Sequence, residues 1–508
     1  MIPTSCRTSG VRSRRSGAFL GLVLPVLALL LPGAGGAQAP SPGVPPEVLR
    51  ALRDTVAARY VTPIPPESLA RFTSAELLLA SLHDRHTVLL SPEARREFEV
   101  QSGAAFGGIG ARLGLRRDTT FIVSVQPGSP AARAGLRPFD RIVAVDGRPV
   151  AGLATDSIVA LIRGPVGTPV GLGLRRGLAG EPVQAVLIRA PVQIPSVPAG
   201  ALLPNGIGVI RLAQFGPEAT REVAEALDWM VEGRARAVIL DLRDNPGGLL
   251  TEALRVAQLF VPRGTELVEV RGRPGTATER PRADTRPRYP TLPLTLLLNE
   301  QSASAAEVLA GALQDAGRAT VAGRQSFGKG SVQHLVNLPE GWALKLTTAR
   351  WYTPNGRRID RGALADTSRI DPAAPHDGGI VPDLPLPADT TPQMLARVAL
   401  AAGPRWDSLN LAMLDWVLAA GDTLTGITQE FQVDPAQARA VLERAGLAGQ
   451  LPPGTDSAVV GWVASALGRG AVGARLGVME EGAWALMHDP EIVGLARHLA
   501  GEESQGSP

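Results

Sequence analysis

Cysteine is almost absent from this chain of 508 residues, and its one example, Cys6, lies near the amino terminus. The rest of the chain therefore has no disulfide and no thiol nucleophile. Lysine is nearly as scarce: of 51 Lys and Arg residues, only Lys329 and Lys345 are lysines. Arginine cannot be deprotonated in a protein, whereas a buried lysine can lose its proton. Because arginine supplies the positive charge elsewhere in the chain, the two lysines are candidates for a chemical role such as that of a base.

An excess of charge of either sign is also missing once the amino-terminal segment is set aside. The formal net charge is +3, but residues 1–39 hold four arginines and no acid. The remainder carries 47 basic against 48 acidic residues, or about −1. Nucleic acid and anionic membrane surfaces are therefore not expected partners. His83 and His86 lie three positions apart without further residues at ligand spacing, so no metal and no cofactor is expected.

The amino terminus has the pattern of a secretory signal peptide over residues 1–39. Basic residues precede an apolar stretch from Ala18 to Leu31, and small residues end at Ala37-Gln-Ala39. The apolar stretch is shorter than the roughly 20 residues that a spanning helix needs. We expect an exported protein of the periplasm or cell envelope, which could associate with a membrane only through this leader. Whether the leader is cleaved or retained as an anchor is left open.

The most informative stretch runs from Thr291 to Gln333. An apolar run from Thr291 to Asn299 is followed by Ser302-Ala-Ser-Ala-Ala-Glu307 and then by good helix formers. This order predicts a strand, a turn and the start of a helix. A serine in that turn lies beside backbone N–H groups that no helix carbonyl has claimed. Such donors can stabilise a developing oxyanion, as an acyl-transfer site requires.

A serine nucleophile needs a base, and Lys329 stands between two glycines shortly after that helix. In an extended segment Lys329, Ser331 and Gln333 share one face, so the Gln333 amide could orient the lysine amine. In water at pH 7, the neutral form of a lysine lies about 4–5 kcal/mol above the protonated form. We therefore expect the loop around Lys329 to be buried.

Four segments resemble the carboxyl-terminal processing proteases, which use a Ser-Lys pair. Three of them are Asp241-Leu-Arg-Asp-Asn-Pro-Gly-Gly248, Asn299-Glu-Gln-Ser-Ala-Ser-Ala-Ala-Glu307 and Tyr352-Thr-Pro-Asn-Gly-Arg357. The fourth is Phe327-Gly-Lys-Gly330, with Gln333 after it. The four segments occur together in the order 241–248, 299–307, 327–330 and 352–357, and this combination is specific to the family. The resemblance extends from about Val48 to about Leu386.

The resemblance implies the roles of the site residues. Ser304, the second serine of its segment, is the expected nucleophile; Lys329, 25 positions later, is the base, and Gln333 assists it. The loop that follows the apolar run 237–242 is expected to supply an oxyanion donor from Gly247 or Gly248. The second donor is expected to be the backbone N–H of Ala305 or that of Ser304 itself.

Residues 101–190 resemble a PDZ domain, a small, partly open β-barrel with two helices. Phe106-Gly107-Gly108-Ile109-Gly110 is similar to the loop whose backbone N–H groups bind a C-terminal carboxylate. Ser129 and Pro130 predict the cap and first turn of one helix, and Asp156 to Arg163 a second helix beside the peptide groove. Such a domain binds a peptide as an added strand. The alternative is that these glycines serve only as turns.

The whole is predicted to be a multidomain α/β protein with a ClpP/crotonase-like α/β protease core. After the leader we expect a helical region at 40–100, the PDZ domain at 101–190, the protease core at 191–388 and a helical region at 389–508. Residues 271–289 are rich in Arg, Pro and Thr and predict an exposed loop. The C-terminal region is outside the resemblance, and packing, dimerisation and docking roles remain open for it.

The expected function is that of an exported serine endopeptidase that cleaves polypeptides near their C-termini. Its partners would be unstructured C-terminal tails of exported proteins; a homo-oligomer or an activator protein is left open. One alternative is a catalytically inactive peptide-binding scaffold, and another is a hydrolase of small esters or amides. A histidine-based triad is disfavoured, because His334 alternates with Gln333 and should point away from the site.

Overall fold

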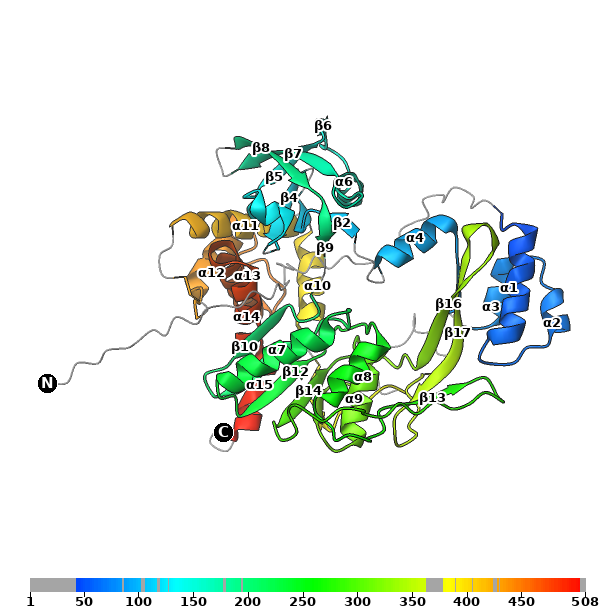
Figure 1. Ribbon diagram of the computed structural model, residues 1–508. Coiled ribbons are helices and arrows are strands. Elements are labelled where there is room, and N and C mark those ends of the chain that lie inside the picture. Colours follow the sequence, from blue (N-terminus) through cyan, green and yellow to red (C-terminus); the bar gives the residue numbers. More distant parts are fainter. Residues whose placement is uncertain are drawn as a thin grey trace.

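The computed structural model describes the chain from Gly43 to Glu502, with short gaps. The described ranges are 43–84, 86–101, 106–116, 119–126, 128–176, 180–192, 195–361, 378–388, 390–403, 405–423, 427–428 and 430–502. The expected signal peptide, residues 1–39, lies outside them. Among the described residues, no helix combines the length and apolarity needed to cross a membrane. Figure 1 shows the order and placement of the elements.

The amino-terminal region is helical, as its apolar spacing predicts. It contains α1 (Pro46–Arg59), α2 (Pro66–Ala70), α3 (Ala75–Ser81) and α4 (Pro92–Gln101). A proline in the first turn of α1 and of α2 fits the position where no backbone donor is needed. The short strand β1 (Val88–Leu90), which the sequence did not predict, pairs antiparallel with β17 (Ala343–Tyr352). Leu344 and Leu346 of β17 join the apolar core of these helices, so the amino-terminal region packs against the part of the chain that carries the expected site.

The segment expected to be a PDZ domain forms its own sheet and core. The sheet has the order β3-β4-β5-β7-β8, with β6 paired to β5, and β2 pairs separately with β9. The first helix, α5, begins at Pro130 after a Ser129 cap that accepts a hydrogen bond from the Ala132 N–H, as the sequence predicts. The elements are β2 (Phe106–Gly108), β3 (Ala111–Arg116), β4 (Thr119–Val125), α5 (Pro130–Arg133), β5 (Arg141–Val145), β6 (Arg148–Pro149), α6 (Thr155–Ile162), β7 (Pro169–Arg176), β8 (Glu181–Ile188) and β9 (Ala190–Val192).

A six-stranded sheet of order β10-β11-β12-β14-β15-β18 forms the centre of the molecule. Only β10 runs antiparallel to its neighbour; the other pairs are parallel. Helices α7, α8 and α9 share one apolar core with this sheet. The elements are β10 (Ala199–Leu202), β11 (Ile207–Arg211), α7 (Ala219–Glu232), β12 (Ala237–Asp241), α8 (Leu250–Gln258), β14 (Leu294–Leu298), α9 (Ala305–Asp315), β15 (Thr320–Gly323) and β18 (Leu384–Pro385). The loops after β12, β14 and β15 therefore emerge at the same edge, where α/β sheets place their sites.

A second, four-stranded sheet lies between this core and the amino-terminal helices (Figure 1). Its central strand β17 pairs with β1, β13 (Glu269–Gly272) and β16 (Ser331–Asn337), and a short 3₁₀ turn, η1 (Pro339–Gly341), joins β16 to β17. The β16–β17 register shifts between Val332 and Gln333. This strand pair begins two residues after Lys329, so the second sheet fixes the segment that carries the expected base.

The prediction of an exposed loop over residues 271–289 is wrong in part. Tyr289 is buried, and its hydroxyl lies 2.9 Å from the Ala224 carbonyl oxygen and 2.7 Å from Asp228 Oδ1, both of which are acceptors for its proton. Ala283 is also buried in the core. Five of the six arginines of the segment are exposed as expected, whereas Arg273 is half-buried, and Ala283 and Tyr289 anchor the segment to the core.

The C-terminal region is helical, as predicted, and falls into two parts. Helices α10–α13 share a core of their own, whereas α14 and α15 join β10, β11, β12, β14 and β15 in a core that covers the other face of the central sheet. The helices are α10 (Thr391–Ala402), α11 (Arg405–Thr423), α12 (Pro435–Arg444), α13 (Asp456–Leu476), α14 (Val478–Met487) and α15 (Pro490–Ala500). Of the roles that the sequence left open, packing against the catalytic core is therefore one.

Candidate active site

Ser304 lies at the turn between β14 and α9, where the sequence placed it. It is the N-cap residue of α9 and has φ 56° and ψ −116°, in the left-handed region that non-glycine residues rarely adopt. The side chain is partly accessible, while Ala303 and Ala305 on either side are buried. A residue held in such a conformation is fixed by its surroundings, and strained residues of this kind cluster at active sites.

The buried carboxylate of Glu307 joins the serine turn to the lysine loop. It accepts hydrogen bonds from the backbone N–H of Ser304 at 2.7 Å and of Lys329 at 2.9 Å, both on Oε2. On Oε1 it accepts from the Ser326 hydroxyl and the Gly328 N–H, both at 2.6 Å. Burial raises the pKa of this carboxyl, and the four donors oppose that shift. The backbones of the expected nucleophile and base thus meet on one oxygen.

The sequence pattern predicts no role for Glu307 beyond its place in a motif. A signal for it was present, because Ser304 and Glu307 have the three-residue spacing of a helix capping box. That spacing explains the bond to the Ser304 N–H. The contacts to the loop at Ser326 and Lys329 join residues far apart in sequence and needed the fold.

Lys329 is half-buried, and its loop is held by the backbone contacts described above. Burial, followed by the positive charge of Lys345, lowers the pKa of the Lys329 amine, while Glu307 opposes the shift. Lys345, expected to be a solvated or structural strand residue, is half-buried on β17, and burial lowers its pKa as well. The two lysines of the chain therefore belong to one electrostatic neighbourhood.

Gln333 lies on the same strand face as Ser331, as the extended spacing predicts. Its Nε2 donates to the Ser331 hydroxyl at 2.8 Å and to the Thr347 hydroxyl at 3.4 Å. The backbone N–H of Thr347 donates in turn to the hydroxyl of Thr87, which donates to Asp84 at 2.8 Å. Gln333 is thus oriented by a chain of hydrogen bonds that begins in the amino-terminal region.

His334 points away from Gln333, as the alternation predicts. Its ring nitrogen Nδ1 lies 2.6 Å from the hydroxyl of Thr348, and its side chain is exposed. We expect His334→Ala to leave kcat/KM for polypeptide cleavage essentially unchanged, because the ring contacts no residue of the proposed site. Steady-state assays of purified wild type and variant check this. A loss comparable to that of Ser304→Ala would show that the histidine takes part in the reaction.

The glycine loop after β12 packs directly against Ser304, the expected nucleophile. Gly247 has φ 103°, and a Cβ added there would meet the Ser304 Cβ at 2.8 Å and the Ala305 nitrogen at 3.0 Å. The Gly247 N–H donates to the Asn245 side chain at 2.8 Å and is therefore occupied. Gly248, with φ 139°, and Ala305 donate from their N–H groups to no acceptor among the described residues. Of the two glycines named from the sequence, Gly248 is the one with a free donor.

Asn245, for which the sequence predicts no separate role, holds this loop in place. The residue is fully buried. Its side-chain amide donates to the Leu212 carbonyl at 2.7 Å, and its backbone carbonyl accepts from the Ala303 N–H at 2.9 Å. Together with its bond to the Gly247 N–H, Asn245 connects β11, the glycine loop and the serine turn.

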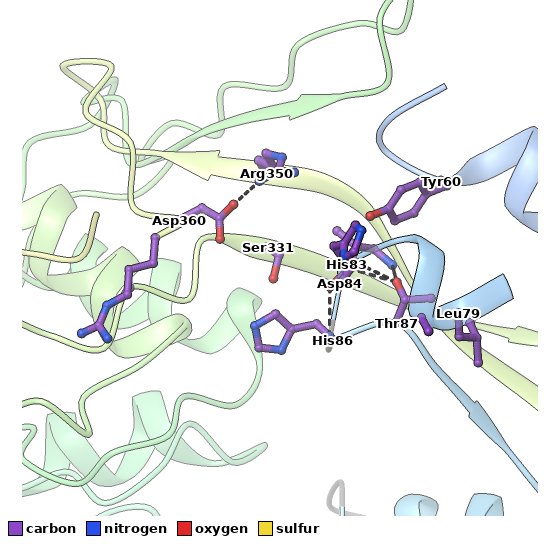
Figure 2. Close-up of a pocket in the computed structure, with 13 residues that line it drawn as sticks. Tyr60, Leu79, His83, Asp84, His86, Thr87, Ser331, Arg350 and Asp360 are labelled. Carbon is purple, nitrogen blue, oxygen red and sulfur yellow. Dashed lines mark hydrogen bonds and ion pairs between the residues drawn. The ribbon is translucent and has the colours of Figure 1, made fainter. Parts of the chain in front are cut away.

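A cavity of about 450 Å³ opens beside the lysine loop, between the amino-terminal region and the second sheet (Figure 2). Gly328 and Ser331, which flank Lys329, line it. Figure 2 shows Arg350 and Asp360, joined by an ion pair, on one side, and Tyr60 and Thr87 on the other. The other lining residues are Leu79, Ala80, His83, Asp84, His86, Thr347 and Arg361. The amino-terminal region thus helps to shape the space next to the expected base.

The glycine loop of the expected PDZ domain is held by its carbonyl groups. The carbonyl of Ile109 accepts from the Ala131 N–H at 2.8 Å, and that of Gly110 from the Gln126 N–H at 2.8 Å. Gly107 is closely packed, since an added Cβ would meet the Gly164 carbonyl oxygen at 2.0 Å. The backbone of Phe106 and Gly108 pairs with β9. The loop is therefore a fixed structure beside α5, the helix that Ser129 caps.

No group of three or more His, Cys, Asp or Glu side chains is placed to hold a metal ion within the part of the chain that the structure describes. The residues expected at the site offer a hydroxyl, an amine, an amide and backbone N–H groups. These are the groups of a serine hydrolase whose base is a lysine.

Comparison with known proteins places the chain in a family. The model of Peptidase family S41 matches residues 206–369, and a PDZ domain model matches residues 121–176. A carboxyl-terminal-processing protease of Synechocystis sp. is 37% identical over 311 residues, which cover 58% of this chain and 70% of that protein. A carboxy-terminal-processing protease of Bartonella bacilliformis is 35% identical over 310 residues, 60% of this chain and 70% of that protein.

The chain belongs to the carboxyl-terminal processing proteases of peptidase family S41, a family of serine peptidases. The predicted fold class, with its α/β protease core, PDZ domain and helical terminal regions, is confirmed. The carboxy-terminal processing protease CtpA of Bacillus subtilis is 34% identical over 287 residues, but the chain spans only 61% of its length. A solved photosystem II D1 C-terminal processing protease is 27% identical, with a TM-score of 0.42, and the match covers 70% of this chain and 97% of that one.

Proposed function

We propose that this chain is an exported serine endopeptidase that cleaves polypeptides near their C-termini by a Ser304–Lys329 dyad. The observation that carries the proposal is the buried Glu307 carboxylate, which holds the backbone N–H groups of both residues on one oxygen. Family membership supports a serine peptidase, and the lowered pKa of the Lys329 amine favours the neutral form that a base requires.

The reaction begins with transfer of the Ser304 hydroxyl proton to the neutral Lys329 amine, while the serine oxygen attacks a peptide carbonyl. The negative charge that develops on the carbonyl oxygen is stabilised by the N–H groups of Gly248 and Ala305. The lysine then gives its proton to the leaving amine, and an acyl-enzyme remains. Water attacks the acyl-enzyme in the second half, with Lys329 again as the base.

Gln333 assists by orienting the lysine amine. Its Nε2 is engaged by the hydroxyls of Ser331 and Thr347, which leaves the amide oxygen as an acceptor for an amine N–H. Because the chain of hydrogen bonds reaches Thr87 and Asp84, the amino-terminal region takes part in this orientation.

The substrate is an unstructured polypeptide tail. A PDZ domain adds an extended peptide to its sheet and binds the terminal carboxylate at a backbone loop, here Phe106 to Gly110. This mode requires a free C-terminus and an unfolded segment. The leader pattern at residues 1–39 supports export, and so exported proteins would supply such tails.

Two other functions have less support. An inactive peptide-binding scaffold needs no aligned nucleophile and base, yet Ser304, Lys329, Gln333 and the glycine loop are all present. A hydrolase of small esters or amides would not need a PDZ domain, which the family comparison finds at residues 121–176.

The test is incubation of the purified chain with an unfolded polypeptide that has a free C-terminus, with products identified by mass spectrometry. We expect cleavage by the wild type and none above background by Ser304→Ala. The same polypeptide with an amidated C-terminus should show a higher KM, because the loop at Phe106 to Gly110 would lose its carboxylate. Cleavage that survives in Ser304→Ala would remove the serine assignment. An ester cleaved far better than any peptide would favour the small-substrate hydrolase.

A further inference from the structure

The C-terminal region reaches the edge of the central sheet where the active-site loops emerge. Its last helix, α15, is capped by Asp489, whose side chain accepts hydrogen bonds from the N–H groups of Glu491 and Ile492, both at 3.0 Å. Pro490 occupies the first helical position. The helix start therefore fixes two carboxylates, Asp489 and Glu491, at a defined place on the core.

The Glu491 carboxylate bridges two arginines that belong to different loops. Its Oε2 accepts from Arg243 Nη1 at 2.7 Å, and its Oε1 accepts from Arg324 Nη1 at 2.6 Å. Asp489 adds a bond of 2.9 Å to Arg243 Nη2. The side chains of Arg243, Arg324 and Glu491 are only 13–16% exposed, so these contacts lie in a drier environment than surface pairs.

Each arginine stands at the root of a loop that carries a residue of the proposed site. Arg243 follows β12 and precedes Gly247 by four residues; it is also bound in a bidentate manner to the buried Asp241. Arg324 follows β15 and precedes Lys329 by five residues. It also donates to Glu300 at 3.0 Å, and Glu300 precedes Ser304 by four residues on the loop after β14.

We propose that Glu491, supported by Asp489, is a positioning residue that holds the glycine loop, the serine turn and the lysine loop in register. The inference rests on the proposed function. It assigns a role to a region that neither the family match at residues 206–369 nor the PDZ match covers. Glu491 acts through Arg243 and Arg324 and does not touch the reacting atoms.

The competing explanation is that these ion pairs only attach α15 to the core. Apolar contacts already do this, because Ile492, Leu495 and Ala496 are buried against the sheet. Burying charges merely for attachment is costly, since desolvation offsets much of the attraction. A cavity of about 990 Å³ also lies beside Arg243, Asp489 and Glu491, so neighbouring side chains do not fully enclose Arg243. The hydrogen bonds of Arg243 are therefore the contacts that define its position.

The test uses Glu491→Gln in the full chain, with Asp456→Asn as the matched control. Asp456 pairs with Arg439 in the same helical region, but both side chains are more than half exposed. The measurements are the second-order rate at which a fluorophosphonate probe phosphonylates Ser304 with loss of fluoride, kcat and KM with an unfolded polypeptide, and thermal unfolding. We expect Glu491→Gln to lower the phosphonylation rate and kcat about 10- to 100-fold with KM little changed. Asp456→Asn should match the wild type, and Glu491→Asp should recover part of the loss.

Each outcome decides between the explanations. A Glu491→Gln protein that melts earlier but is phosphonylated at the wild-type rate well below its melting temperature would overturn the inference, leaving only attachment. If Glu491→Gln fails to fold, Glu491→Asp gives the same decision. The proposed function fails separately, if the wild type itself is not labelled at Ser304.

Discussion

Replacing Lys329 by methionine should lower kcat/KM for polypeptide cleavage by about 10³-fold or more, because the serine loses its base. Methionine has a similar length and fills the same space without an amine. The backbone N–H of residue 329 still donates to Glu307, so the loop should keep its position. Steady-state kinetics and the rate of Ser304 acylation measure the loss.

Stability provides the control for Lys329→Met. Burial lowers the pKa of the amine in the folded chain, so the unfolded state binds the proton more tightly. Stability therefore rises with pH between the folded and unfolded pKa values, and below the unfolded pKa this lysine lowers the free energy of unfolding. Removing it should leave the melting temperature equal or higher. A variant that loses activity together with its folded structure would not support the assignment.

Replacing Gly247 by alanine should lower kcat about 10²- to 10³-fold, the range found when an oxyanion donor is lost. The added Cβ would lie 2.8 Å from the Ser304 Cβ and 2.9 Å from the Ala303 carbonyl oxygen. Both contacts are too close, so the glycine loop or the serine turn must shift. The N–H groups of Gly248 and Ala305, the proposed oxyanion donors, would then change their relative positions.

Gly264→Ala is the matched control for the backbone conformation. Gly264 has φ 91°, close to that of Gly247, but a Cβ added there meets nothing within 4 Å. Both variants carry the cost of a left-handed L-residue, about 1–2 kcal/mol. Gly264→Ala should lose stability and keep kcat, whereas Gly247→Ala should lose both. Equal activities in the two variants would mean that contact with Ser304 does not matter.

The nucleophile turn and the lysine loop could be predicted because their signals are local. An apolar run followed by a serine and helix formers defined β14 and α9, and the scarcity of lysine singled out Lys329. Alternation along β16 correctly separated Gln333 from His334. In each case the informative residues are neighbours in sequence.

The parts that the sequence did not predict depend on contacts between distant segments. Glu307 meets residues 326–329, and Asn245 meets Leu212 and Ala303, through hydrogen bonds that no local pattern encodes. Tyr289 is buried although its neighbours in sequence are polar, because its hydroxyl finds partners on α7.

The same reason explains what was missed in the C-terminal region. The helical spacing there predicted helices but not their partner surface. Only the fold shows that α14 and α15 cover the second face of the central sheet and bring Glu491 to Arg243 and Arg324.

The most direct test of the account is the pH dependence of Ser304 phosphonylation by a fluorophosphonate probe, in the wild type, Lys329→Met and Lys345→Met. We expect the wild-type rate to rise with pH through an apparent pKa below the ordinary value for lysine, because the neutral Lys329 amine is the proposed base. Lys329→Met should lose this rise. Lys345→Met should move it to higher pH, since the charge of Lys345 lowers the pKa of Lys329. A pH profile of phosphonylation in Lys329→Met that matches the wild type would contradict the account.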